Sequence, residues 1–253
     1  MARGDELTVD VIELDDDRRL RVVLPDGYHR GDRSYPVIYV LDERWSLGAV
    51  ADCSVMLGMQ RLMPKVICVG IGYQDESLAV VSERRGGDYT PTDWPFPAFT
   101  SIRGTHPSGG APATIDRLID RIVPLVEARY RADAGDRVLF GHSLSGLCAA
   151  WCFLTRPGTF HRYLLSSPSI WWHERVAMTL PLPAVEAGTR LFLTAGGDER
   201  GSSSGVFEAG EAFAERLIEA GHDASFRELP GELHHSTIGA SVSAGLRALY
   251  RTS

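Results

Sequence analysis

The sequence lacks an excess of basic residues and contains only one lysine, Lys65. Its 26 lysine and arginine residues face 33 acidic ones, which gives a formal net charge of -7. Proteins that bind nucleic acid neutralise its phosphates with a basic surface, and this composition indicates no such surface. We therefore expect no nucleic-acid partner.

Cysteine is scarce, and no pair has the C-x-x-C spacing of a metal or redox site. Cys53, Cys68, Cys148 and Cys152 each lie in an apolar run, which is typical of buried free thiols in a reducing compartment. No apolar run approaches the roughly 20 residues that span a bilayer. Residues 1–10 contain no apolar segment of a secretion signal. We therefore expect a cytoplasmic location and no membrane partner.

What the sequence does contain is a regular alternation of short apolar runs and longer helical patterns over 253 residues. This alternation is typical of βαβ units, and it predicts an α/β fold with a mostly parallel central sheet covered by helices on both faces. The first two runs flank a short charged turn, so they should pair antiparallel. We expect strands at residues 7–14, 20–24, 37–41, 66–71, 138–140, 163–165, 191–194 and 225–229, and helices at residues 46–62, 114–130, 144–154, 206–220 and 238–250.

A single domain over residues 1–253 is the economical interpretation, because no break in composition looks like a linker. Residues 73–113 are rich in glycine, proline and aromatic residues without periodicity, so we expect an irregular, loop-rich segment that is functional or mobile. Pro124 lies inside the helical pattern that follows. Proline should kink that helix there or start a second one.

The strongest chemical signal is the segment RVLFGHSLSG at residues 137–146, where a buried strand meets a helix of small residues. This is the context of a nucleophile elbow, in which a sharp turn exposes a serine hydroxyl at the edge of the sheet. Such a turn needs small residues on both sides of Ser143, and Gly141 and Ser145 satisfy that need. The backbone N–H of Leu144 would then face a developing oxyanion. The plain alternative is a Gly-Ser turn that only joins the two elements.

Two acidic residues follow the strand predicted at residues 191–194, behind a pair of glycines. The acid that orients a catalytic histidine belongs after this strand, because the order along the chain is serine, acid, histidine. Either Asp198 or Glu199 fits that place, and each could equally be a solvated loop charge.

Two adjacent histidines, His234 and His235, follow the last predicted strand and a Pro-Gly turn. A histidine in this loop fits the general base that takes the proton of Ser143. A metal site is conceivable for a histidine pair, but no third ligand accompanies it at a sensible spacing along the chain. The sequence therefore predicts a general base here and no metal.

A second oxyanion donor should come from the loop after the strand at residues 37–41. That loop reads DERW, and the backbone N–H groups of Glu43 and Arg44 are the candidates. We take Arg44 as the expected donor.

Several segments together resemble the putative-esterase family of the α/β-hydrolases, which includes esterase D-like enzymes and the enterobactin- and bacillibactin-type siderophore trilactone esterases. The matching segments are YVLD, RRGGDYTPT, GHSLSG, SPSIWW, LTAGGDER and PGELHHS, which cover most of the chain. The SPSIWW segment is the most specific of them and favours the trilactone esterases.

The resemblance implies an α/β-hydrolase fold and assigns roles to residues that the pattern alone left open. The G-x-x-E and G-E-x-H patterns of the family fall on Glu199 and His234, so these are preferred over their neighbours, with Ser143 as nucleophile. The sequence departs from the family at two positions. Ser145 and Glu43 stand where the family has glycine, and the second departure puts the substrate in doubt more than the chemistry.

Three further residues are candidates for substrate binding. Trp171 and Trp172 follow a predicted strand on the catalytic edge, and at least one of two adjacent tryptophans should line the pocket. Arg85 would form a structural clamp with Asp88 and Tyr89, and the resemblance also allows it an anion-binding role toward a catecholate or carboxylate.

These residues predict a serine carboxylic-ester hydrolase that forms an acyl-enzyme, needs no cofactor and takes a small-molecule ester, such as a siderophore-type trilactone or related macrolactone. The same acyl-enzyme could pass its acyl group to an alcohol or amine, so an acyltransferase or cyclase is the alternative. A non-catalytic binding protein on the same scaffold is the least favoured interpretation. The sequence does not predict the oligomeric state.

Overall fold

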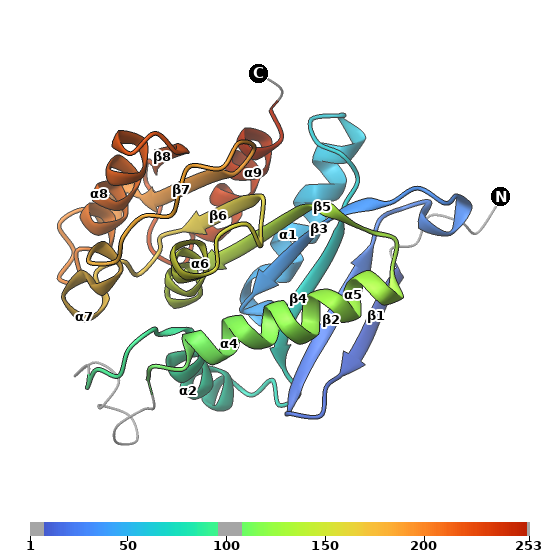
Figure 1. The fold of residues 1–253 in the computed structure, drawn as a ribbon, viewed down its shortest axis with the longest axis horizontal. Coiled ribbons are helices and arrows are strands. Elements are labelled where there is room, and N and C mark those ends of the chain that lie inside the picture. Colours follow the sequence, from blue (N-terminus) through green and yellow to red (C-terminus); the bar gives the residue numbers. More distant parts are fainter. Residues whose placement is uncertain (1–7, 96–107, 252–253) are drawn as a thin grey trace.

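One sheet of eight strands, in the order β1-β2-β4-β3-β5-β6-β7-β8, forms the centre of the molecule (Figure 1). The computed structural model describes residues 8–95 and 108–251. The strands are β1 Thr8–Glu13, β2 Arg18–Leu24, β3 Tyr35–Leu41, β4 Ile67–Tyr73, β5 Ala132–His142, β6 Arg162–Ser166, β7 Arg190–Gly196 and β8 Asp223–Leu229.

The strand pairing follows the predicted pattern. β1 pairs antiparallel with β2, in a register that places Thr8 opposite Leu24, and β2 pairs antiparallel with β4. All the pairs from β4 through β3 and on to β8 are parallel. The carboxyl ends of these parallel strands meet at one edge, where α/β folds place their ligands.

Helices cover both faces of the sheet (Figure 1), as expected for parallel strands that are apolar on both sides. α1 and α9 pack on one face, and α4, α5, α6 and α8 pack on the other. The α-helices are α1 Glu43–Met59, α2 Leu78–Tyr89, α4 Ala111–Arg117, α5 Val123–Arg129, α6 Leu144–Thr155, α7 Trp172–Arg175, α8 Val206–Glu219 and α9 Thr237–Leu249. Short helical turns lie at η1 Tyr28–Arg30, η3 Val176–Met178 and η4 Gly197–Glu199. No helix of the described ranges is long and apolar enough to cross a membrane.

Pro124 interrupts its helix as predicted. A π-helical turn, η2 Leu118–Ile122, joins α4 to α5, and Pro124 lies in the first turn of α5. Because proline has no N–H to donate, the wider turn before it absorbs the missing backbone hydrogen bond.

The expectation of an irregular segment over residues 73–113 is wrong for a large part of its length. β4 extends to Tyr73, α4 begins at Ala111, and α2 lies between them. The helix α2 begins after Ser77, whose hydroxyl accepts a hydrogen bond from Val80 N–H. It escaped the sequence pattern because it buries few residues and carries two glycines, which have low helix propensity. The rest of the predicted segment includes residues 96–107, which lie outside the described residues.

The glycine pair of β4 makes room for a buried carboxylate at the start of α1. A Cβ atom on Gly72 would lie 2.2 Å from Glu43 Oε2, and one on Gly70 would lie 2.5 Å from Glu43 Cγ. The Glu43 carboxylate forms ion pairs with Arg19 at 3.0 Å and with Arg21 at 2.7 Å. Glu43 thus fixes the first turn of α1 against β2 and β4.

Replacing Glu43 by alanine should lower the free energy of unfolding by about 3 kcal/mol, because it leaves the guanidinium of Arg19 buried with one carboxylate fewer. Urea unfolding of both proteins measures this difference. The matched control is Glu76→Ala, which removes the other carboxylate that pairs with Arg19. Because Glu76 is much more exposed, that change should cost less than about 1 kcal/mol. Equal losses for the two variants would contradict the buried role of Glu43.

Candidate active site

Ser143 lies at the tip of a sharp turn between β5 and α6. Its backbone takes φ 60° and ψ -120°, a strained conformation for a residue with a side chain. Glycine is required two residues before it, since a Cβ on Gly141 would lie 2.2 Å from the backbone oxygen of Ser145. The strain is held by the backbone N–H of Ser143, which donates to Ser166 O at 3.0 Å. This is the geometry of the predicted elbow.

Ser145, which departs from the family pattern, closes the turn with its own side chain. Its hydroxyl accepts from the backbone N–H of His142 at 2.9 Å and donates to the backbone oxygen of the same residue at 2.8 Å. The side chain is fully buried. A serine is therefore accommodated here because it folds back onto the turn, so the departure leaves the elbow intact.

His234 faces the hydroxyl of Ser143. Its Nε2 atom lies 2.8 Å from Ser143 Oγ, although the two residues are 91 positions apart in the sequence. The loop between β8 and α9 carries His234 over the end of β7. That passage depends on glycine, because a Cβ on Gly196 would lie 2.1 Å from the backbone oxygen of Glu232.

Glu199 completes a hydrogen-bonded chain with Ser143 and His234. Its Oε1 lies 2.5 Å from His234 Nδ1, and its Oε2 accepts from Ser167 Oγ and from Gly196 N–H, both at 2.6 Å. Burial alone would raise the pKa of this carboxyl, but the hydrogen bonds to His234, Ser167 and the Gly196 backbone outweigh it and lower the pKa. The carboxyl is thus held ionised beside the imidazole.

Of the two acids and two histidines that the pattern left open, the structure brings Glu199 and His234 to Ser143. Asp198 is exposed, and its backbone N–H donates to Glu232 O. His235 is also exposed, with its ring centroid 5.2 Å from that of His234.

A buried network of hydroxyl groups lies beneath the three residues, and the sequence interpretation missed it. Ser166 Oγ lies 2.9 Å from Ser241 Oγ, which lies 2.6 Å from Thr194 Oγ1. Thr237 Oγ1 donates to the backbone oxygen of His234 at 2.8 Å and so fixes the histidine loop. The available signals were the runs SSPS, which begins at the last residue of β6, and HST at the start of α9, both rich in hydroxyls.

His142, next to Ser143, was also missed. It is 4% exposed, and its Nδ1 lies 3.1 Å from Ser166 Oγ. Burial, followed by the nearby His234 and Arg85 side chains, lowers the pKa of His142 well below its ordinary value, so the ring is neutral. The sequence shows no third ligand at a sensible spacing from the histidine pair, but the fold brings His142 close to both rings from another element.

The two predicted oxyanion donors belong to the first turns of two helices that lie on opposite faces of the sheet. Leu144 begins α6, and Arg44 is the second residue of α1. Backbone N–H groups in a first helical turn have no acceptor within their own helix, and the helix dipole favours negative charge there. Both helices start at the carboxyl edge, after the adjacent strands β3 and β5.

The sequence predicts a clamp of Arg85 with Asp88 and Tyr89. In the structure, Arg85 and Tyr89 instead hold Asp42, the residue before α1. Asp42 has a positive φ of 56°. Arg85 Nη2 donates to its carboxylate at 2.8 Å, and Tyr89 Oη accepts from its backbone N–H at 3.1 Å. Asp88 instead accepts from Arg18 at 2.8 Å. The clamp on the residue before α1 therefore comes from one face of α2.

The two adjacent tryptophans take different positions. Trp172 is completely buried, and its Nε1 donates to Thr92 Oγ1 at 3.3 Å. Its predicted contact with substrate is therefore wrong, because the ring packs against Trp94 and the core and has no exposed surface. Trp171 is half-buried beside Trp94, whose ring also stacks on His173 with centroids 5.5 Å apart. Trp171 thus remains available as a wall residue.

Comparison with known proteins gives a consistent result. A family model described as "Putative esterase" matches residues 12–235. Ferri-bacillibactin esterase BesA of Bacillus subtilis (strain 168) is 32% identical over 228 residues, which are 84% of this chain and 78% of that protein. Siderophore enterobactin esterase of Emericella nidulans is 36% identical over 118 residues, 45% of this chain and 39% of the relative.

Among solved structures, the BES protein from Bacillus cereus superposes with a TM-score of 0.77 at 26% identity, covering all (100%) of this chain and 97% of that one. With the strand order above, this likeness confirms the predicted α/β-hydrolase fold.

Proposed function

Because this chain belongs to the family described as "Putative esterase" and is a carboxylic ester hydrolase, we propose that Ser143, His234 and Glu199 form its catalytic triad. One observation carries the proposal. The hydroxyl of Ser143, whose backbone is strained, lies 2.8 Å from the His234 imidazole, and that imidazole lies 2.5 Å from the buried Glu199 carboxylate. In this arrangement a serine becomes a nucleophile at neutral pH.

The acylation step uses each of these atoms. His234 Nε2 takes the proton of Ser143 Oγ as the oxygen attacks the ester carbonyl carbon. The carbonyl oxygen becomes an oxyanion, which accepts hydrogen bonds from the backbone N–H groups of Leu144 and Arg44. His234 then gives its proton to the departing alkoxide, so that an alcohol leaves and an acyl-Ser143 ester remains.

Deacylation repeats the sequence with water. His234 removes a proton from a water molecule, the hydroxide adds to the acyl carbon, and the proton returns to Ser143 Oγ as the carboxylic acid departs. In both steps the imidazole becomes cationic beside Glu199. The ionised carboxylate stabilises that cation and keeps the neutral ring in the tautomer whose Nε2 accepts a proton.

For the substrate, we propose an ester of the siderophore trilactone class. The support is twofold. Two relatives carry names that specify esters of bacillibactin and enterobactin. Near the elbow, half-buried Trp171 offers an aromatic wall to an aromatic acyl group. We further propose a cytoplasmic location, supported by four cysteines that are free thiols.

A panel of esters tests this proposal. Short p-nitrophenyl esters, aromatic esters and a catecholate trilactone, the last with and without bound iron, are compared by kcat/KM. We expect the trilactone to exceed p-nitrophenyl acetate by at least about 100-fold, because binding energy from remote groups lowers the barrier for the full substrate. Equal values would contradict the substrate class. Transfer of the acyl group to an added alcohol or amine in preference to water would identify an acyltransferase instead.

A further inference from the structure

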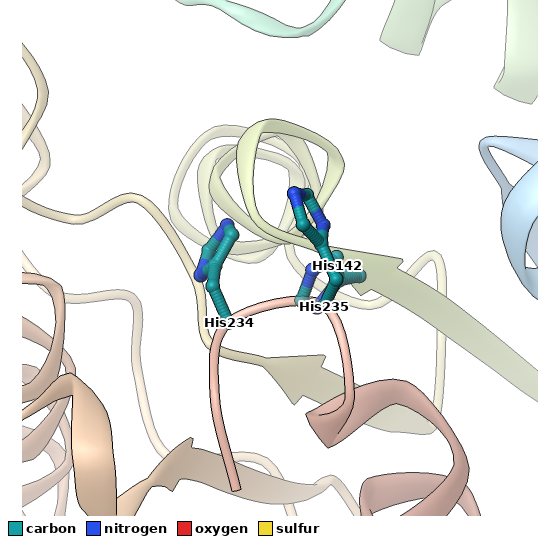
Figure 2. A group of neighbouring side chains, drawn as sticks. All are labelled: His142, His234 and His235. Atoms are coloured by element: carbon teal, nitrogen blue, oxygen red, sulfur yellow. The ribbon is translucent and has the colours of Figure 1, made fainter.

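Three imidazole rings gather at the carboxyl edge of the sheet (Figure 2). His142 comes from the end of β5, while His234 and His235 come from the loop between β8 and α9. One ring nitrogen from each of the three lies within 4.8 Å of the others. The triad uses only His234, so its mechanism does not explain the other two rings.

His142 presents a nitrogen that nothing in the described part of the chain satisfies. Its Nε2 is buried and has no hydrogen-bond partner among residues 8–95 and 108–251. Its Nδ1 is occupied by Ser166 Oγ at 3.1 Å. When Nδ1 donates its proton to that hydroxyl, Nε2 carries a free lone pair. Buried polar atoms are almost always paired, so this nitrogen is free to accept a water molecule or to bind an ion.

His234 is oriented as metal-binding histidines are. Its Nδ1 lies 2.5 Å from the Glu199 carboxylate, so Nε2 is the nitrogen whose lone pair can bind a metal. A carboxylate behind the imidazole fixes its tautomer and raises its basicity toward a metal. Nε2 is also the atom that takes the proton of Ser143, from which it lies 2.8 Å away. A cation on this atom and the catalytic hydrogen bond therefore exclude each other.

The distances fit a cation after a small adjustment. Imidazole nitrogens lie about 2.0–2.1 Å from zinc, so two of them on a tetrahedral ion are roughly 3.3 Å apart. The observed separations of at most 4.8 Å must therefore close by about 1.5 Å or less. His235 is exposed and lies in a loop, so its ring can make that movement without disturbing the core.

We propose that His142, His234 and His235 form an inhibitory binding site for a divalent transition-metal cation of the zinc class, which blocks the catalytic imidazole reversibly. Three neutral imidazoles suit zinc, copper and nickel, whereas magnesium and calcium prefer oxygen ligands. The hydroxyl of Ser143 or a water molecule supplies the fourth ligand. The cation acts here as an inhibitor and takes no part in ester hydrolysis.

Zinc titration of p-nitrophenyl acetate hydrolysis, in a buffer that does not bind metals, tests the site. We expect inhibition by zinc that excess EDTA reverses, and no inhibition by magnesium. His235→Gln should raise the zinc concentration for half-inhibition by at least about tenfold, because one of three ligands is lost. The matched control is His29→Gln, an exposed histidine distant in sequence, which should leave the zinc response unchanged. An unchanged response in His235→Gln, or equal inhibition by magnesium, would overturn the proposal.

A direct binding measurement keeps the test independent of catalysis. Isothermal titration of zinc into Ser143→Ala should show one site per chain. Adding His235→Gln or His142→Gln to that protein should weaken the site, and His235→Gln changes only an exposed ring. If zinc fails to bind Ser143→Ala, or binds wild type without slowing hydrolysis, the inhibitory site is wrong even where the triad holds. If the ester assay itself fails, the triad is wrong while the binding result still decides the metal site.

Discussion

Replacing Ser143 by alanine should lower kcat for ester hydrolysis by about 10⁴-fold or more, because triad residues act as a unit and the loss of the nucleophile removes the acyl-enzyme route. The fold should persist. Alanine keeps the Cβ atom that the turn already accommodates, and the backbone hydrogen bond from residue 143 to Ser166 O does not involve the hydroxyl. The measurement is steady-state hydrolysis of p-nitrophenyl acetate, with thermal unfolding to verify the fold.

A nearby serine supplies the control for this variant. Ser169 is buried, and its Oγ lies 3.4 Å from Ser143 Oγ, too far for a strong hydrogen bond. Ser169→Ala should keep kcat within about tenfold of wild type, since the hydroxyl it removes has no part in bond formation. Covalent labelling by a fluorophosphonate should be lost in Ser143→Ala and retained in Ser169→Ala. Full hydrolysis by Ser143→Ala would mean that another nucleophile does the chemistry.

Replacing Glu199 by glutamine should lower kcat by about 10⁴-fold, the size of effect that follows when the histidine is held in the wrong tautomer. The reason lies in the hydrogen bonds of the carboxylate. Its Oε2 accepts from Ser167 and from the Gly196 backbone, so the amide oxygen of glutamine takes that place. The amide NH₂ then faces His234 Nδ1. This nitrogen must accept, its proton moves to Nε2, and Nε2 no longer takes the proton of Ser143.

The adjacent acid is a control within the same turn. Asp198→Asn changes an exposed carboxylate that does not approach the histidine, so kcat should stay within about twofold of wild type, as for most surface substitutions. Comparing kcat for the two variants separates the acids that the sequence pattern left open. A large loss in Asp198→Asn together with a small loss in Glu199→Gln would reassign the triad acid.

The sequence predicted those parts of the site that depend on local geometry. The elbow could be found from residues 137–146 alone, because its steric demand falls on Gly141 and on Ser145 close to the serine. The positions of the strands, their mostly parallel arrangement and the two loops that carry the acid and the histidine followed from alternating apolar patterns. The choice between Glu199 and its neighbour needed either the family resemblance or the coordinates, since both acids occupy the same turn.

Other parts depend on contacts between distant segments, and no local pattern predicted them. Arg85 pairs with Asp42 across 43 positions, and nothing near Arg85 in the sequence distinguishes that partner from Asp88. Trp172 is buried because Thr92 and Trp94 pack against it. Thr92 lies 80 positions earlier in the sequence. The third imidazole, His142, joins the histidine pair only when β5 and the loop after β8 meet at one edge.

The separation of 91 positions between Ser143 and His234 of the proposed triad has a consequence for the chain while it is being made. Ser143 leaves the ribosome long before His234, and the strands β6, β7 and β8 must all be added to the sheet in between. A nascent chain that ends before the last strand therefore holds a finished turn and no base. We therefore expect translation products that stop before His234 to carry no esterase activity.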